Sequence, residues 1–424
     1  MKFKKFLFSC LAVSSFVYGE MQSSWIDYHL SPFVGGENIL MLHKGIERME
    51  DSLFSKPSLE ESRSIFLTSP SQYSRNFREL LFWIPVNLSG VVSQHEVFGH
   101  GYRIRDLGSE YATVSGYKMY VIGGSTSYQF TPQLTTSQLL SIQIAGIEAN
   151  EIMANQMRMK WLGNGQIDPR QHLLYIASAL SLTQYSFVKD PSHQNPATTG
   201  NDVVSFLHYL KATYPDTSLD QSQLRLIALT NLLDPFFYLS FMASYDYIHT
   251  GRSPSLPMFR FGPVKYLPAA KVALTPFGIQ GFLEQFFQVN EGSPTYAYLK
   301  WGKNGANTYS GFGMRNEGLF QHVWGSLGLR ADLWIQPDVL FEQGLLSAGE
   351  VMEIPRGAEI PQLYPDEVLQ KKRWGGAVSL IGAIGKETWP ARMLLELGCK
   401  SQGFLPGEAL RAAPIVRGGF SAHF

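Results

Sequence analysis

The chain has 424 residues, enough for two ordinary domains, and 45% of them are hydrophobic, which predicts a folded core rather than a disordered chain. Lysine plus arginine (35) equals aspartate plus glutamate (35), so no overall positive charge recruits nucleic acid, and we expect no nucleic-acid partner. The mean hydropathy of −0.07 excludes a chain built mostly of membrane-spanning helices, and two cysteines exclude a disulfide framework.

Residues 1–19 have the pattern of a secretory signal peptide. Lys2, Lys4 and Lys5 precede an apolar stretch from Phe6 to Val17. This stretch is shorter than the ~20 apolar residues that a membrane-spanning helix needs. We therefore expect an exported protein that works in the periplasm or at the outer membrane of a Gram-negative-type bacterium.

From residue 20 to 252 the pattern is mainly helical, and we expect one helical domain here. Long segments with almost no charge, such as 80–94, 131–147 and 226–245, alternate with breaks that contain glycine or proline. In 111–130, alternating residues around a Gly-Gly pair predict two strands instead.

The helical region contains the sequence QHEVFGH at residues 94–100. Two histidines, His95 and His100, with Glu96 directly after the first predict a metal-dependent hydrolase. Neutral imidazoles bind Zn²⁺, and the carboxylate takes a proton from water. The histidines are five positions apart, which leaves about 140° between their side chains in a regular α-helix. A one-residue π-type bulge would bring them to one face, and Gly99 favours such a distortion.

This motif, His-Glu-x-x-Gly-His, resembles the zinc motif of the dipeptidyl-peptidase III family, in which the longer spacing is the rule. The resemblance covers two short segments and implies a gluzincin-type peptidase, whose third zinc ligand is a glutamate on a later helix. Glu148 and Glu151 lie at a matching distance along the chain. We favour Glu148, because small residues beside it let another helix approach. The family's paired-glutamate motif is not reproduced, so its overall fold and specificity do not carry over.

Asp234 is another candidate for the third ligand. It lies within the apolar segment 226–245, and the arrangement resembles intramembrane site-2 proteases, which pair a His-Glu motif with an aspartate on a later apolar helix. The motif here has one residue more than the site-2 form. An aspartate before Pro235 is also typical of a helix end.

After about residue 253 the pattern changes to period two. Segments such as 327–335, 393–399 and 416–424 alternate apolar residues with polar residues or glycine, and roughly eight such segments follow residue 257. They predict an antiparallel all-β domain at 253–424. Such a domain can close as a soluble sandwich or barrel, or as a transmembrane barrel. The final Phe424 resembles the end of the last strand of bacterial outer-membrane barrels, and we favour a barrel in contact with outer-membrane lipid. The length of the region suits eight strands.

These patterns predict an α+β chain with a helical, zincin-like domain followed by an antiparallel β-domain. We expect an exported zinc peptidase that acts on a peptide or protein substrate. His95, His100 and Glu148 would hold Zn²⁺, with Glu151 or Asp234 as the alternative third ligand, and Glu96 would act as general base. Two other functions stay open: a non-enzymatic outer-membrane protein with a helical plug, and an intramembrane site-2-type protease.

Overall fold

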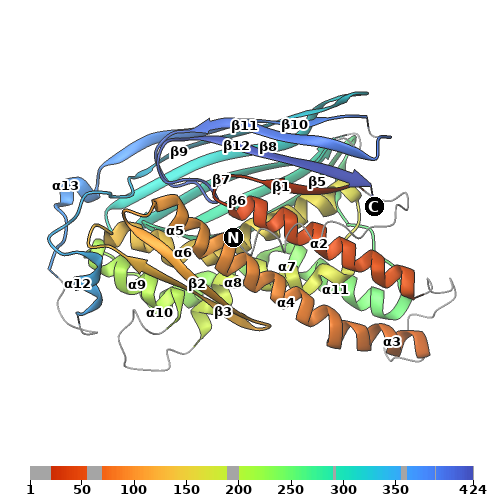
Figure 1. Ribbon diagram of the computed structural model, residues 1–424, viewed down its shortest axis with the longest axis horizontal. Coiled ribbons are helices and arrows are strands. Elements are labelled where there is room, and N and C mark those ends of the chain that lie inside the picture. Colours follow the sequence, from red (N-terminus) through yellow and green to blue (C-terminus); the bar gives the residue numbers. More distant parts are fainter. Residues whose placement is uncertain are drawn as a thin grey trace.

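The computed structural model describes residues 21–54, 69–188, 200–289, 293–354, 361–386 and 388–423. The predicted signal peptide at 1–19 lies outside these residues. A layer of helices packs against one large antiparallel sheet (Figure 1). The prediction of an α+β chain with helices before an antiparallel sheet is confirmed.

The central helix is α6 (Thr136–Asn164), which is buried along most of its length. Reciprocal hydrogen bonds between Thr135 and Gln138 cap its start, and it ends at Gly165, whose backbone is left-handed. The other helical elements are α2 (Pro32–Leu53), α3 (Pro70–Arg78), η2 (Glu79–Trp83), α4 (Ile84–Ser93), η3 (Gln94–His100), α5 (Gly101–Leu107), η4 (Pro169–Gln171), α7 (His172–Ala179), α8 (Ser181–Phe187), α9 (Asp202–Thr213), α10 (Gln221–Ala228), η6 (Leu229–Leu233), α11 (Pro235–Thr250), α12 (Ala348–Met352) and α13 (Asp366–Leu369).

The large sheet has ten strands in the order β1-β12-β11-β10-β9-β8-β7-β6-β5-β4. Its edge strand β1 (Met21–Ile26) comes from before the helices and pairs with the C-terminal strand β12 (Ala413–His423), so the segment predicted to be helical also contributes to the sheet. The strands between them are β4 (Phe259–Phe261), β5 (Val264–Thr275), β6 (Gly278–Val289), β7 (Thr295–Asn304), β8 (Asn307–His322), β9 (Gly325–Pro337), β10 (Lys372–Ile384) and β11 (Ala391–Lys400).

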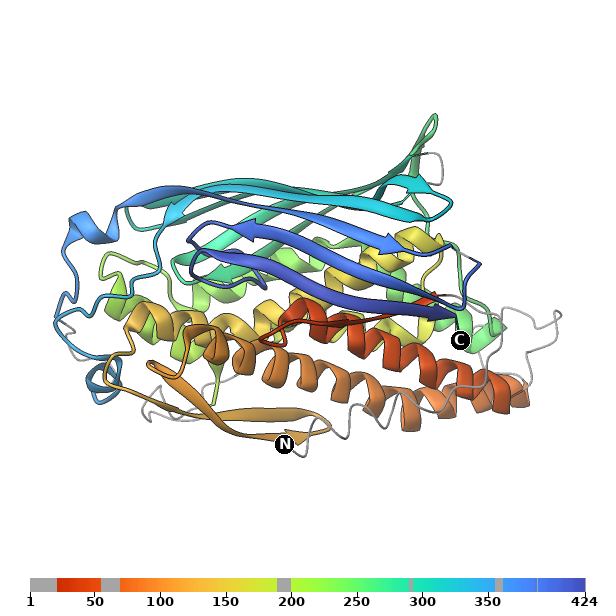
Figure 2. The same cartoon turned by 45° about the horizontal axis from the view of Figure 1, so that its top comes forward.

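The sheet is open, with β1 and β4 at its two edges, and differs from the predicted eight-stranded barrel in both strand number and closure. The reason lies in what the sheet covers, since it curves over the helices (Figure 2). Trp161 of α6 and Phe236 of α11 pack in one cluster with Phe286 and Tyr296 of the strands. An eight-stranded barrel has room for little more than its own side chains. A sheet that covers a buried helix therefore stays open.

The two faces of the sheet differ sharply in polarity. Toward the helices it directs buried charged side chains, among them Glu284, Lys300, Asp332, Glu396 and Arg417. The opposite face, called the outer sheet face below, is apolar and exposed. It carries Leu283, Leu299, Trp301, Phe312, Leu333, Leu380, Leu397 and Val416.

A separate two-stranded sheet confirms the strand pair predicted at 111–130. It consists of β2 (Ala112–Tyr120) and β3 (Gly123–Phe130), paired antiparallel. In both views this hairpin lies on the side of the helical layer away from the large sheet (Figures 1 and 2).

None of the described helices is by itself long and apolar enough to cross a membrane. The segments Gln221–Leu233 and Pro235–Thr250 reach the required length and composition only as a pair, and they are bent by 59° at the break between them.

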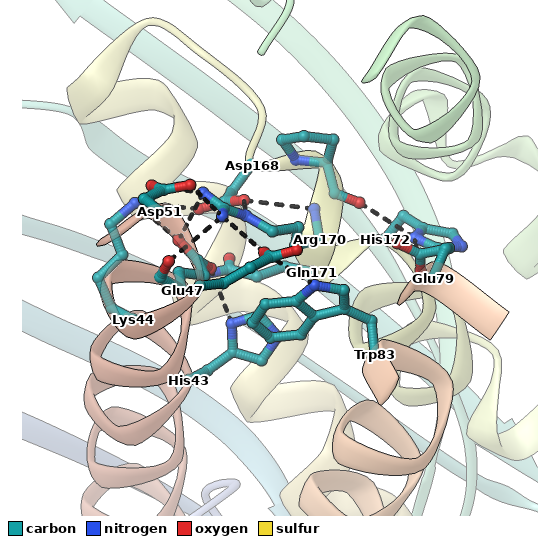
Figure 3. Close-up of polar contacts among 12 residues, drawn as sticks. His43, Lys44, Glu47, Asp51, Glu79, Trp83, Asp168, Arg170, Gln171 and His172 are labelled. Carbon is teal, nitrogen blue, oxygen red and sulfur yellow. Dashed lines mark hydrogen bonds and ion pairs between the residues drawn. The ribbon is translucent and has the colours of Figure 1, made fainter. Parts of the chain in front are cut away.

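A group of charged side chains, most of them buried or half-buried, connects α2, η2, η4 and the start of α7 (Figure 3). Arg170 is at its centre and binds Glu50 at 3.0 Å and Asp51 at 2.8 Å. Glu79 lies beside His172 at the edge of the group. We call this group the charged cluster. It comprises His43, Lys44, Glu47, Glu50, Asp51, Glu79, Asp168, Arg170 and His172.

Candidate metal centre

The predicted distortion of the motif helix is present. Residues Gln94–His100 form a π-helical turn, η3, between α4 and α5. The extra residue in this turn brings the two histidines together, with their Nε2 atoms 3.2 Å apart. Both are buried, with 4% of His95 and 7% of His100 exposed.

Gly99 allows the motif turn to pack closely against α6, whereas the sequence suggested that this glycine favours the distortion of the motif helix. Its backbone is not left-handed. A Cβ atom at this position would lie 2.6 Å from the carbonyl oxygen of Ala145 and 2.7 Å from the Cα atom of Gly146. The motif turn therefore rests directly on the backbone of α6, where the small residues favour the approach, as predicted. The imidazole ring of His95 occupies the space above Gly146.

The acid that joins the two histidines is Asp202. Its Oδ2 atom lies 2.9 Å from Nε2 of His95 and 3.2 Å from Nε2 of His100. Asp202 is the first residue of α9, and the side chain of Asn201 caps this helix. A helix N-terminus favours a negative charge. Among the described residues, these three form the only group of histidine, cysteine and acidic side chains whose ligand atoms all lie within 4.8 Å of one another.

Glu148, the favoured third ligand, does not reach the histidines. Gly146 of α6 faces His95. Two positions further along a helix, the side chain points in a direction about 200° away around the helix axis. Glu148 therefore points to the opposite side of α6. There it pairs with Arg103 at 3.0 Å and accepts a hydrogen bond from the backbone N–H of Gly407.

The two alternative ligands also lie apart from the histidines. Glu151 faces Lys271 on β5, with 3.6 Å between the carboxylate oxygen and Nζ. Asp234 pairs with Arg158 at 2.7 Å, and its side chain caps α11. The interpretation of Asp234 as a helix-end residue is thus confirmed.

Each histidine has a contact that orients its ring. Nδ1 of His100 donates a hydrogen bond to the carbonyl oxygen of Ile142 at 2.7 Å, which leaves Nε2 as the metal-binding atom. Nδ1 of His95 lies 3.3 Å from the side-chain amide of Asn150. Oδ1 of Asn150 has no partner among the described residues. A half-turn of this amide would let Oδ1 accept the Nδ1–H of His95 and orient that ring in the same way.

Tyr185 of α8 is a further side chain at this point. Its ring stacks on His95 with centroids 5.2 Å apart and an interplanar angle of 6°. Its hydroxyl oxygen lies 3.2 Å from Nε2 of His95, beside the three ligand atoms. No spacing in the sequence connects Tyr185 with the motif.

The electrostatics of the site favour a cation. Burial opposes the protonation of His100, but the carboxylates of Asp202 and Glu96 outweigh it and raise the pKa of His100 to about 9. Burial likewise opposes the ionisation of Asp202, but the two histidines hold its pKa well below the usual range. Asp202 therefore stabilises a positive charge beside it, whether a proton on His100 or a metal ion carries that charge.

Glu96 lies toward the hairpin. Its Oε2 atom accepts a hydrogen bond from the hydroxyl of Thr126 on β3 at 2.7 Å. The same hydroxyl lies 3.0 Å from the backbone carbonyl of Glu96. Gly124 leaves room for this contact, because a Cβ atom there would lie 2.8 Å from Cγ of Glu96. The hairpin thus fixes the carboxylate next to the histidines.

The three ligand atoms fit a small divalent cation. They are separated by 2.9, 3.2 and 3.2 Å. A tetrahedral site with bonds of ~2.1 Å requires separations of ~3.4 Å. Two imidazoles and one carboxylate are a common set in zinc hydrolases, and the same set suits several other divalent ions.

Comparisons with known proteins found no matching family model, no similar curated protein and no similar solved structure.

Proposed function

We propose that this chain is a metal-dependent hydrolase, and specifically an exported zinc peptidase. In this proposal His95, His100 and Asp202 hold Zn²⁺, and Asp202 takes the place that the sequence assigned to Glu148. The observation that carries the proposal is the convergence of two imidazole nitrogens and one carboxylate oxygen, with Glu96 directly after the first ligand.

A bound Zn²⁺ would polarise a carbonyl group and lower the pKa of a water molecule. Glu96 would take a proton from the attacking water and return it to the leaving amine. Thr126 holds the Glu96 carboxylate in position through Oε2. Tyr185 has its hydroxyl beside the ligand atoms. From there it would donate a hydrogen bond to the oxyanion of the transition state.

The substrate class rests on the motif. His-Glu-x-x-Gly-His resembles the motif of zinc peptidases, and this resemblance supports a peptide or protein substrate. The balanced total charge argues against nucleic acid.

The test compares the wild-type chain with Glu96→Gln. Both should contain about one zinc per chain, because Glu96 is not a ligand. Hydrolysis of a mixture of synthetic peptides, followed by mass spectrometry, should fall about 10²–10⁴-fold in the variant, the usual contribution of a general base. Glu110→Gln changes an exposed acid and is the control. A wild-type chain that binds zinc and cleaves no peptide would refute the peptidase, and one that binds no divalent ion would favour the non-enzymatic alternative.

We further propose that the outer sheet face contacts outer-membrane lipid. The support for this proposal is the polarity of the sheet, which is the reverse of that in a soluble protein. Its charged side chains point toward the helices, and its large apolar side chains are exposed. Strands of transmembrane barrels alternate in this sense. Monomeric soluble proteins rarely expose so many contiguous apolar side chains.

Cell fractionation tests the membrane proposal. The wild-type chain should sediment with outer membranes and resist extraction by salt. Replacing both Leu299 and Leu380 by lysine should reduce the membrane-bound fraction, because lysine on a lipid-facing strand costs about 2–4 kcal/mol at the bilayer midplane. A wild-type chain found entirely in the soluble fraction would contradict lipid contact.

A further inference from the structure

A cavity of about 320 Å³ lies between α6 and the large sheet. We call it the interior cavity. Glu151 and Asn155 of α6 form part of one wall, and Tyr296, Tyr298 and Arg330 of the sheet form part of the other. α6 separates it from the metal centre, since Gly146 and Asn150 are the α6 residues that contact His95. Its volume is at the lower end of the ~300–1,000 Å³ typical of small-molecule sites.

Several charged side chains that line the interior cavity already have a close partner of opposite sign. Lys160 pairs with Glu37 at 2.9 Å. Arg330 pairs with Asp332 at 2.8 Å. These groups compensate one another and create no demand for a charged ligand.

Glu151 differs from these pairs. It is 8% exposed, and its Oε1 atom has no hydrogen-bond partner among the described residues. Its Oε2 atom lies 3.6 Å from Nζ of Lys271, which is too far for a hydrogen bond. Lys271 also faces Glu284, at 3.5 Å. One lysine therefore serves two buried carboxylates.

The charges around Glu151 do not balance. Glu284 also pairs with Arg158 at 2.7 Å, and Arg158 in turn pairs with Asp234 at 2.7 Å. Three carboxylates thus share two cations, so Glu151, which lines the interior cavity at the end of this series, has no full counter-charge of its own. Burial, opposed only in part by Lys271, raises the pKa of Glu151 to about 7.

Asn155 supplies a second hydrogen-bond acceptor. It lies one helical turn after Glu151 on the same face of α6. Its Oδ1 atom is buried and has no partner within the described parts of the chain. The wall thus presents two buried acceptors, one of which belongs to a carboxylate without a full counter-charge.

We propose that the interior cavity binds a small organic cation whose primary ammonium group donates hydrogen bonds to Glu151 and Asn155. An ammonium group has three donors and no acceptor, which matches the two unpartnered oxygens. Its charge balances the excess carboxylate. The rings of Tyr296 and Tyr298 form an aromatic wall for an aliphatic chain.

Titration calorimetry of the full chain with butane-1,4-diamine tests the proposal. Butane-1,4-diol and succinate have the same four-carbon length and are the neutral and anionic controls. We expect saturable binding of the diamine, with at least about tenfold weaker binding of the diol and of succinate, since hydrogen bonds to charged groups contribute about 1.5–3 kcal/mol.

Variants locate the site. Glu151→Gln should weaken diamine binding by about tenfold or more. Asn155→Asp should strengthen it severalfold, because it adds a second carboxylate. Glu110→Gln and His95→Ala should both bind like the wild type. The His95 variant separates this site from chelation at the metal centre, so the result does not depend on the proposed hydrolase.

Three results would overturn the proposal. The first is the absence of saturable diamine binding by the wild-type chain. The second is equal affinity for the diamine and either control compound. The third is unchanged diamine affinity in both the Glu151 and the Asn155 variants.

Discussion

The Nε2 atoms of His95 and His100 lie 3.2 Å apart although five positions separate the residues. A regular α-helix would point the two rings about 140° apart. The π-helical turn η3 removes this difference, and the close contact of Gly99 with α6 holds the turn in place. Asp202 completes the group from a helix that begins 102 positions after His100.

The structure predicts that Asp202, and not Glu148, is required for metal binding. Asp202→Asn keeps the size of the side chain and removes its charge, and we expect metal affinity to fall by at least about 100-fold. Glu148→Gln should keep about one metal ion per chain, because Glu148 binds Arg103 on the other side of α6. Elemental analysis after dialysis against a weak chelator measures both. The reverse pattern would restore the ligand set expected from the sequence.

Two glycines on α6 provide a matched pair of substitutions. A Cβ atom at position 146 would collide with the imidazole ring of His95, whereas one at position 163 would have 3.8 Å to its nearest neighbour, Pro294. Gly146→Ala should therefore displace His95 and abolish metal binding. Gly163→Ala should keep the metal and stabilise the helix by about 0.5–1 kcal/mol. Metal content and thermal unfolding of the two variants check this, and equal metal content in both would contradict the close contact.

Asn150 is expected to act on the metal through His95. Removing the amide with Asn150→Ala leaves the Nδ1 atom of His95 without its orienting contact, and we expect metal affinity to fall by about 10–100-fold. Asn150→Asp keeps an acceptor at the same place and should restore most of the affinity. Competition with a fluorescent chelator gives the dissociation constants. If the alanine variant binds metal as tightly as the wild type, Asn150 has no part in orienting the ring.

Local patterns in the sequence predicted the features that depend on neighbouring residues. The histidine pair, the π-type turn and the hairpin at 111–130 all follow from short-range spacing, and all are present. The alternation after residue 257 likewise predicted antiparallel strands.

Features that depend on distant segments were not predicted. No spacing rule connects Asp202 to the histidines, and the only local signal was an Asn-Asp pair at the start of a helical pattern. Helical rotation from Gly146 places Glu148 on the opposite side of α6, but this becomes informative only once Gly146 is known to face His95. The sequence did not predict that the sheet is open. Whether a sheet closes into a barrel depends on what packs against its inner face, which here is a helix.

Glu79 predicts how stability depends on pH. Its two carboxylate oxygens are buried and accept no hydrogen bond from the described residues. Nδ1 of the neighbouring His172 lies 3.4 Å away, but this atom donates to the carbonyl oxygen of Pro169 (Figure 3). Burial, with a further contribution from Glu50, raises the pKa of Glu79 from 4.5 to about 8. The folded chain therefore keeps a proton on Glu79 at neutral pH, where the unfolded chain has lost it.

Because the folded state binds this proton more tightly, the contribution of Glu79 to stability falls as pH rises from 4.5 to about 8. The glutamine side chain of Glu79→Gln is neutral at every pH, so this variant should not lose stability over this pH range. We expect the variant to match the wild type below pH 4.5 and to be more stable by up to about 5 kcal/mol well above pH 8. Denaturant unfolding followed by tryptophan fluorescence at several pH values measures the difference. Glu342→Gln changes an exposed acid and should follow the wild type throughout. A constant difference between Glu79→Gln and the wild type across this range would mean that Glu79 is ionised in the folded chain.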